Sequence, residues 1–172
     1  MDTATTGYKD IDQDIEDINE EMLYDTFFGN ESGYYKNRLM RMRNGTNAIF
    51  NGYAFFLGVL WFAYRKMYVE VAIIILALII LQVLLELSGF VNTGIDKLST
   101  LICAFILGYT GNYLYIKKAI RTVEKAKEIY INPGDRLTFL EKEGGVSILM
   151  PILLVAGIVA LMIGALALIE FA

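Results

Sequence analysis

The sequence predicts an all-α membrane protein with three transmembrane helices and one short re-entrant or interfacial helix. Two observations predict this class. Hydrophobic residues make up 56% of the 172 residues, which is more than an ordinary soluble domain contains. The charges are also segregated, because residues 71–81, 98–116 and 148–169 carry none. Four full spans are the alternative architecture.

Residues 1–46 are predicted to form a cytoplasmic tail, and its first 31 residues contain ten carboxylates and one lysine. Apolar residues recur there at helical spacing among acidic ones, which predicts a short amphipathic acidic helix; they are Ile11, Ile15, Ile18 and Met22. This helix could dock on the protein's own basic loops or on a protein partner. A weakly ordered, solvated tail fits the same composition equally well.

Residues 48–64 form the first apolar segment. It contains Asn51, Gly52 and Gly58, and its 17 residues are at the lower limit for crossing a bilayer. Aromatic residues crowd around it, and such rings favour the headgroup level of a membrane. The segment is therefore expected to dip into the bilayer and return, or to lie at its surface.

The remaining segments complete a membrane domain over residues 47–172. Residues 71–87, 98–116 and 148–169 are each long and apolar enough to span. The basic loop at 117–145 begins with apolar residues on one side and basic residues on the other, which predicts a helix that continues from the preceding span.

The distribution of Lys and Arg predicts the topology. If all four segments cross, six or nine of the 15 cations are cytoplasmic, depending on orientation. If residues 48–64 do not cross, 14 of the 15 are cytoplasmic and only Lys97 is outside. The positive-inside rule favours the second arrangement. The N-terminus is then cytoplasmic and the C-terminus lies outside a cell (inner or cytoplasmic) membrane.

The composition restricts the available chemistry. Histidine is absent, and Cys103 is the single cysteine, so imidazole triads, His-ligated metals and intramolecular disulfides are excluded. No nucleotide-binding glycine loop occurs either. We therefore expect no enzyme, cofactor or metal. The net charge of −4 argues against nucleic acid, and the basic clusters are read as topology determinants.

Three polar side chains accompany the most apolar segment: Glu70 at its entry, and Gln82 and Glu86 deeper. Intramembrane carboxylates are candidates for proton or cation handling. Glu70 and Glu86 are about 24 Å apart along a helix, however, so glutamates at the two membrane surfaces are the alternative reading. Gln82 and Glu86 share one face.

Small residues recur at four-residue spacing in the last two spans, which allows helices to approach closely. One stripe contains Thr100, Ala104 and Gly108 and continues to Asn112, which can form a hydrogen bond across such a contact. The other contains Ala156, Ala160 and Gly164. The simplest expectation is that the two stripes pack on each other, and a homo-oligomer interface is the alternative.

Several short motifs resemble one bacterial family. They are Phe28-Gly29, Tyr34-Tyr35, Phe50-Asn51, Ala54-Phe55-Phe56, Gly58, Trp61, Tyr64-Arg65-Lys66-Met67-Tyr68, Gly111-Asn112-Tyr113-Leu114-Tyr115 and Gly144-Gly145. Over roughly residues 27–147 the chain resembles domain-of-unknown-function family 2628, which comprises small multi-pass inner-membrane proteins. Gly52 and Val59 replace the Trp and Pro that relatives often have. The resemblance implies a membrane protein and brings no activity or catalytic residue.

These observations favour a non-enzymatic multi-pass membrane protein that acts as a scaffold, an adaptor or an accessory subunit of a membrane complex. Its expected partners are the lipid bilayer, a protein bound through the acidic tail, and a second copy of the chain. The alternative is a small channel or transporter component that uses Glu86 and Gln82. A third hypothesis is stress sensing through headgroup contacts at residues 48–64.

Overall fold

The structure is a computed structural model that describes residues 20–46, 49–89 and 93–170. Within these three ranges the regular secondary structure is entirely helical, and no strand is present. The all-helical class predicted from the sequence is therefore confirmed for this part of the chain.

The chain divides into two compact units. Unit 1 combines the residues up to Thr46 with Ile116–Gly145, and unit 2 combines Asn47–Tyr115 with Val146–Ala172. From the sequence, residues 117–145 are predicted to be a loop of the membrane domain. The structure instead groups them with the N-terminal segment, because apolar side chains from both pack in one core.

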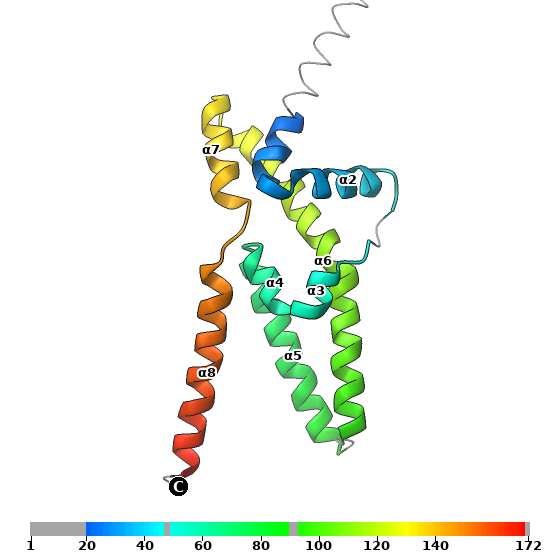
Figure 1. Cartoon of the computed structure of the whole chain (residues 1–172), viewed down its shortest axis with the longest axis vertical. Coiled ribbons are helices and arrows are strands. Elements are labelled where there is room, and N and C mark those ends of the chain that lie inside the picture. The colour runs from blue at the N-terminus through cyan, green and yellow to red at the C-terminus, as the bar shows by residue number, and fades with distance from the viewer. Residues whose placement is uncertain (1–19, 47–48, 90–92, 171–172) are drawn as a thin grey trace, which may run out of the picture. The chain divides into compact units, whose positions relative to one another are not determined.

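Unit 1 begins with a helical segment over residues 20–28. The chain turns sharply at the short 3-10 helix η1 (Gly29–Glu31) and continues as α2 (Ser32–Arg43), as Figure 1 shows. Helix α7 (Pro133–Glu143) starts where the Asn132 side chain accepts a hydrogen bond from the Gly134 amide. Proline at the first turn suits that start, because its missing N–H would have no helical partner there.

The core of unit 1 is aromatic and aliphatic. Ala119, Val123 and Ala126 lie on one face of α6 (Thr93–Ile129) and are 1% exposed or less. They are buried with side chains from the N-terminal segment and α7, namely Phe27, Phe28, Tyr35, Leu39 and Leu140. The Phe28 and Tyr35 rings stack with their centroids 5.3 Å apart. The predicted continuation of the third span into residues 117–129 is confirmed.

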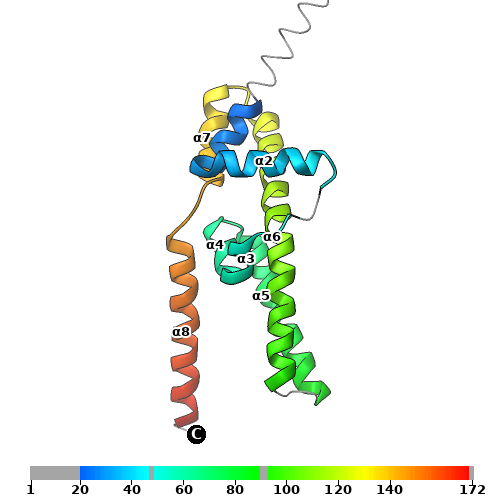
Figure 2. The same cartoon turned by 45° about the vertical axis from the view of Figure 1, so that its right-hand side comes forward.

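Unit 2 contains span-length helices. Among the described residues, three helices are long and apolar enough to cross a membrane: α5 (Tyr68–Ser88), α6 and α8 (Leu149–Glu170). Figures 1 and 2 both show α5 and the first part of α6 side by side and antiparallel. Helix α8 contacts α4 (Val59–Tyr64). The described side chains along α5 and α8 are largely exposed, as suits helices that face lipid.

The segment predicted as one short helix over residues 48–64 consists of two. Helix α3 (Gly52–Leu57) and α4 each have six residues and meet at Gly58. Gly58 has φ 53° and ψ −128°, a conformation that side-chain-bearing residues rarely adopt. The glycine therefore breaks the helix without the proline that relatives often carry one residue later. Residue 48 itself lies outside the described ranges.

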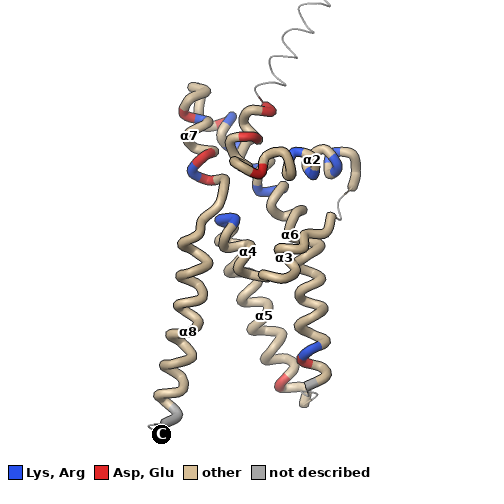
Figure 3. Tube along the Cα trace, in the orientation of Figure 1, with Lys and Arg blue, Asp and Glu red and all other residues tan. Residues whose placement is uncertain are grey.

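The charges follow the division into units. Figure 3 shows Lys, Arg, Asp and Glu concentrated in the parts of the chain that form unit 1, whereas the central turns of α5, α6 and α8 carry none. The helices of unit 2 thus have the composition of membrane spans, and those of unit 1 have the composition of a water-exposed unit.

Candidate functional site

The start of α3 is anchored on α6 by two buried asparagines. Asn51 caps α3 by accepting a hydrogen bond from the Ala54 amide at 3.0 Å. Its Nδ2 donates to Oδ1 of Asn112 at 2.8 Å, and its backbone amide donates to the Gly108 carbonyl at 2.8 Å. Asn112 donates to the Ile49 carbonyl at 3.2 Å. Both side chains are 1% exposed, so these bonds are shielded from solvent.

Two glycines of α6 allow this close approach. A Cβ at Gly108 would lie 2.6 Å from a ring carbon of Phe50. A Cβ at Gly111 would lie 2.7 Å from that of Ala54 and 3.3 Å from the indole ring of Trp61. Separations this short require a neighbour to move, so the α3–α4 segment can pack here only because α6 lacks side chains at both positions.

The end of α4 forms the other side of this cluster. Lys66 has φ 56°, and its amide donates to the Ala63 carbonyl while the Met67 amide donates to the Phe62 carbonyl. This pattern is a helix-terminating motif in which glycine usually occupies the left-handed position. Met67 is fully buried and Tyr68 starts α5, so the motif fixes where that span begins.

Arg65 is buried in the same cluster, at 2% exposure. Its guanidinium carbon lies 5.1 Å from the ring centroid of Tyr115 on α6 and 5.5 Å from that of Tyr64. The rings therefore contribute cation–π attraction to a charge that is costly to bury. The Tyr64 carbonyl accepts a hydrogen bond from the Ser147 amide at 2.7 Å, just before α8.

The family model described as a protein of unknown function (DUF2628) matches residues 17–121. The chain belongs to this family. No curated protein and no solved structure matched it in the other two comparisons. The resemblance noted in the sequence is thus confirmed, and the family description assigns no activity.

Residues that suggested the DUF2628 family are neighbours in the folded chain, although up to 64 positions separate them in sequence. The cluster comprises Asn51, Ala54, Trp61, Arg65, Gly111, Asn112 and Tyr115. Within unit 2 these residues bond or pack to one another. Their arrangement positions α3 and α4 against α6 and contains no nucleophile paired with a base. The family motif is therefore a structural junction in this protein.

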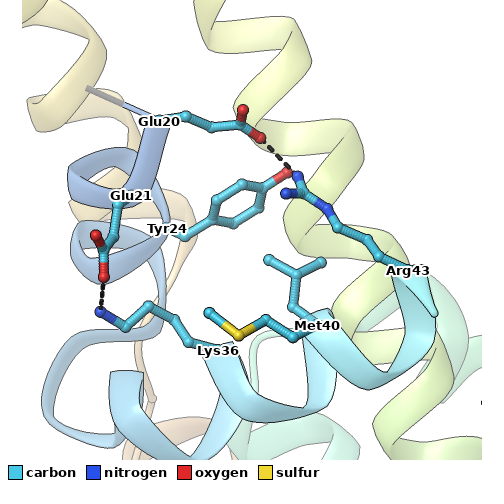
Figure 4. Close-up of a pocket in the computed structure, with 7 residues that line it drawn as sticks. Glu20, Glu21, Tyr24, Lys36, Met40 and Arg43 are labelled. Carbon is cyan, nitrogen blue, oxygen red and sulfur yellow. Dashed lines mark hydrogen bonds and ion pairs between the residues drawn. The ribbon is translucent and has the colours of Figure 1, made fainter. Parts of the chain in front are cut away.

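Unit 1 has a charged pocket of about 310 Å³ between the helical segment 20–28 and α2. Lys36 Nζ lies 2.7 Å from Oε1 of Glu21 and 2.9 Å from Oδ1 of Asp25. Arg43 Nη2 lies 2.6 Å from Oε1 of Glu20. Figure 4 shows the pairs of Lys36 with Glu21 and of Arg43 with Glu20 around Tyr24, with the Lys36 and Arg43 side chains both extending from α2 toward the acidic segment.

Three groups of this pocket have shifted pKa values. The hydrogen bonds that Lys36 donates to Glu21 and Asp25 raise the pKa of Lys36, and the hydrogen bond that Arg43 donates to Glu20 raises the pKa of Arg43. Burial raises the pKa of the Tyr24 phenol, because the neutral form is the less costly one to bury. Because the pKa of Lys36 is higher in the folded than in the unfolded chain, the charged lysine stabilises the fold. This stabilisation is fully present below the unfolded pKa and is lost as the pH rises through the folded pKa.

The two segments of unit 1 are joined at the Gly144-Gly145 pair, another part of the family-like pattern. The Gly145 amide donates to the Phe27 carbonyl at 2.8 Å. A Cβ at Gly144 would overlap that same carbonyl oxygen and would lie 2.8 Å from the Leu140 carbonyl oxygen. Glycine at this position therefore lets the end of α7 contact the backbone of segment 20–28.

The polar residues of α5 occupy different surroundings. Glu70 is in the first turn and partly exposed, whereas the Gln82 Nε2 donates to Oε1 of Glu86 at 3.3 Å near the other end. Gln82 also lines an open, mostly apolar groove between α3, α5 and α6, and Glu86 does not. Thr100, Cys103 and Ala104 line the same groove.

The two small-residue stripes do not pair in the way the sequence suggested. Gly108 contacts Phe50 and Phe55 of the chain around α3, and Thr100 donates a hydrogen bond to the Asp96 carbonyl of its own helix. On α8, Ala156 and Ala160 are exposed, and Gly164 has no neighbouring side chain or backbone within 4 Å of a Cβ position. The α3–α4 segment takes the place beside α6 that the prediction gave to α8.

Two further predictions concern a metal site and the acidic helix. In the described ranges, no three His, Cys, Asp or Glu side chains are grouped so as to hold a metal ion. Ile11, Ile15 and Ile18 of the predicted acidic helix lie outside these ranges. Met22, the fourth residue of that pattern, is in the helical segment 20–28 and is 42% exposed.

The sequence indicated a close approach at Gly108 and a hydrogen bond from Asn112 across a helix contact, but it did not identify Asn51 as the partner or α3 as the element that approaches. The sequence left open whether the acidic helix docks on the protein's own basic loops or on a partner. The structure pairs its described carboxylates with Lys36 and Arg43.

Proposed function

We propose that this protein is a non-enzymatic multi-pass membrane protein that acts as a scaffold, an adaptor or an accessory subunit of a membrane complex. The observation that supports this role is unit 1, a packed helical unit with its own aromatic core and a charged surface. A simple membrane anchor needs no such unit, whereas an adaptor needs a folded surface for its partner.

The same proposal includes a topology. Residues before α5 and residues after position 116 up to α8 face the cytoplasm of a bacterial cell, and the short connection between α5 and α6 faces outside. This arrangement places 14 of the 15 cations on the cytoplasmic side. Lys97, in the first turns of α6, is the single cation outside.

Residues 51–65 are proposed to be re-entrant. Asn51 bonds to Gly108 and Asn112, and Arg65 lies over the Tyr115 ring. The two ends of the segment therefore meet α6 within seven residues, or about 10 Å of helix rise, whereas a crossing needs about 30 Å. Two six-residue helices of about 9 Å each also fall short of a span.

Cysteine accessibility in intact cells tests the topology. A Cys103→Ala background would carry Asn37→Cys, Lys97→Cys or Lys127→Cys, each probed with a membrane-impermeant thiol reagent. We expect labelling at position 97 and none at 37 or 127 until the membrane is permeabilised. Labelling at position 37 in intact cells would refute the proposed orientation.

Affinity purification after gentle extraction tests the adaptor role. A stoichiometric protein partner is expected, and replacement of Ile11, Ile15 and Ile18 by Ser should remove it if the acidic tail is the contact. Replacement of the exposed Glu128, Glu141 and Glu143 by Gln is the control, because these residues belong to unit 1 but not to the acidic tail. Absence of a partner in cross-linked cells would contradict the role.

A channel or transporter component is the alternative function, and the groove beside Gln82 favours it. Gln82 lines this mostly apolar groove and donates a hydrogen bond to Glu86, so the two side chains form the candidate site for a proton or cation. Purified protein in vesicles should then conduct protons or cations, and Glu86→Gln should reduce the flux at least tenfold. Flux that is unchanged in Glu86→Gln would refute this use of the site.

A further inference from the structure

Helix α2 carries two pairs of cations on different faces. Its twelve residues contain Lys36, Arg38, Arg41 and Arg43 and no acidic residue. Tyr35 and Leu39 are buried in the core of unit 1 and fix the rotation of the helix. At 100° per residue, Lys36 and Arg43 share a face, and Arg38 and Arg41 lie on the opposite one.

The acidic segment occupies only one of these pairs. Glu21 and Asp25 hold Lys36, and Glu20 holds Arg43. The two carboxylates that hold Lys36 have side chains 59% and 41% exposed, and the Arg43 side chain is 53% exposed. Ion pairs this accessible to water are weak and can exchange for other partners.

The other pair is directed away from these carboxylates. The Arg38 guanidinium carbon lies 3.1 Å from the ring centroid of Tyr34, and the Arg41 side chain is exposed. Tyr34 is 37% exposed, and Met40, which lines the charged pocket beside Lys36, is 60% exposed. Arg38 is half-buried against Tyr34, and Arg41 is exposed. Arginines interspersed with an aromatic ring and a flexible apolar side chain are the composition of a helix that lies at the surface of an anionic membrane.

We propose that α2 binds anionic phospholipid headgroups, and that Glu20, Glu21 and Asp25 compete with the lipid for Lys36 and Arg43. Charge complementarity supports lipid as the occupant, together with the position of α2 in the chain. Asn51, which anchors α3 in unit 2, follows Arg43 by only eight residues. Basic clusters adjacent to membrane segments attract acidic lipids. The inference rests on the membrane location in the proposed function and does not depend on the adaptor role.

The test uses the full chain in lipid nanodiscs. A nitroxide is attached at Asn37→Cys in the Cys103→Ala background, because Asn37 is exposed on α2. Its contact with lipid is measured by collision with oxygen and with a water-soluble nickel chelate, as phosphatidylglycerol replaces phosphatidylcholine. We expect lipid contact to increase with phosphatidylglycerol, and inorganic phosphate in phosphatidylcholine discs to leave the label in water.

Two variants separate the parts of the proposal. Arg38→Gln with Arg41→Gln should reduce lipid contact and leaves the ion pairs of Lys36 and Arg43 in place, so the unit should still fold. E20Q/E21Q/D25N should increase the ratio of lipid-bound to free label about 25-fold, at roughly fivefold for each of two released cations.

The matched control removes the same number of carboxylates from α6 and α7. E128Q/E141Q/E143Q changes the net charge equally, but none of these side chains pairs with α2 in the described chain. An equal gain in this control would overturn the competition. Lipid contact of the label that does not change with phosphatidylglycerol would overturn lipid binding, even though the protein remains in the membrane. An equal increase in the variant that lacks Arg38 and Arg41 would overturn it as well.

Discussion

Unit 1 keeps its charged side chains at the surface, where Lys36 and Arg43 form ion pairs, whereas unit 2 exposes apolar side chains along its long helices and buries polar ones. The buried polar residues of the described chain are Asn51, Arg65 and Asn112, and all three belong to unit 2. The ion pairs that Lys36 and Arg43 form with Glu20, Glu21 and Asp25 belong to unit 1. The two units therefore use polar groups in opposite ways.

The difference follows from the solvent that suits each composition, which is water for unit 1 and hydrocarbon for unit 2. In water, burial of apolar surface drives folding and exposed ion pairs add little. In hydrocarbon, association of helices gains nothing from apolar burial, so close backbone approach and interhelical hydrogen bonds hold the helices together. We therefore expect substitutions at close glycine contacts to be costly in both units. Polar deletions should be costly only in unit 2.

The largest effect is expected for Gly144→Ala in unit 1. A methyl group there would overlap the Phe27 carbonyl oxygen and press on that of Leu140, and backbone atoms cannot move as a side chain can. The cost should be about 3 kcal/mol or more. Hydrogen exchange of residues 20–28 in the full chain, followed by mass spectrometry, should show faster opening.

Gly33→Ala is the matched control for this substitution. Gly33 lies inside α2 with open space around it, and alanine is the better helix former, so the exchange rates should stay the same or fall. Equal acceleration in both variants would mean that Gly144 has no special contact with the N-terminal segment.

A smaller effect is expected for Gly111→Ala in unit 2. Its methyl group would lie 2.7 Å from the Cβ of Ala54, so α3 would have to move away from α6. We expect a loss of about 2 kcal/mol, measured as faster hydrogen exchange over residues 52–65 in nanodiscs. Gly157→Ala on α8 has open space and should be neutral. Similar losses in both variants would contradict the close packing of α3 on α6.

The asparagine pair should give the next effect. Asn51→Ala and Asn112→Ala each leave a buried partner without its hydrogen bond, which should cost about 1.5 kcal/mol. The double variant should be less destabilised than the sum by about 1 kcal/mol, because the second substitution finds the bond already broken. Thermal unfolding in nanodiscs gives all three values. Strict additivity would contradict a direct bond between the side chains.

Much of the fold was predictable from the sequence. The three span-length helices follow from uncharged apolar runs of sufficient length, and the extension of α6 beyond its span follows from apolar positions on one side of residues 116–130. Both are local properties of the chain. The break at Gly58 was not predicted, because a single glycine in an apolar segment is also tolerated inside helices.

The junction was less predictable because it joins residues distant in sequence. Of Thr100, Ala104 and Gly108, only Gly108 is at a close helix contact, and the spacing could not say which element covers it. Phe50 and Phe55 cover Gly108, and α8 does not. The carboxylates that pair with Lys36 and Arg43 likewise depend on the turn at η1, which no motif in the sequence specified.

The smallest effect is expected for Lys36→Gln in unit 1. Lys36 makes two ion pairs, but the carboxylates of both partners are exposed to water, so the variant should lose at most about 1 kcal/mol. Added salt should shrink the difference from the wild type, because ions screen exposed charges. Hydrogen exchange of residues 20–28 at neutral pH, below the raised pKa of Lys36, measures both quantities. Lys127→Gln, an exposed lysine in the same unit, is the control and should be neutral. A loss as large as that of Gly111→Ala, unchanged by salt, would show that polar contacts in unit 1 resemble those in unit 2 and would end the contrast between them.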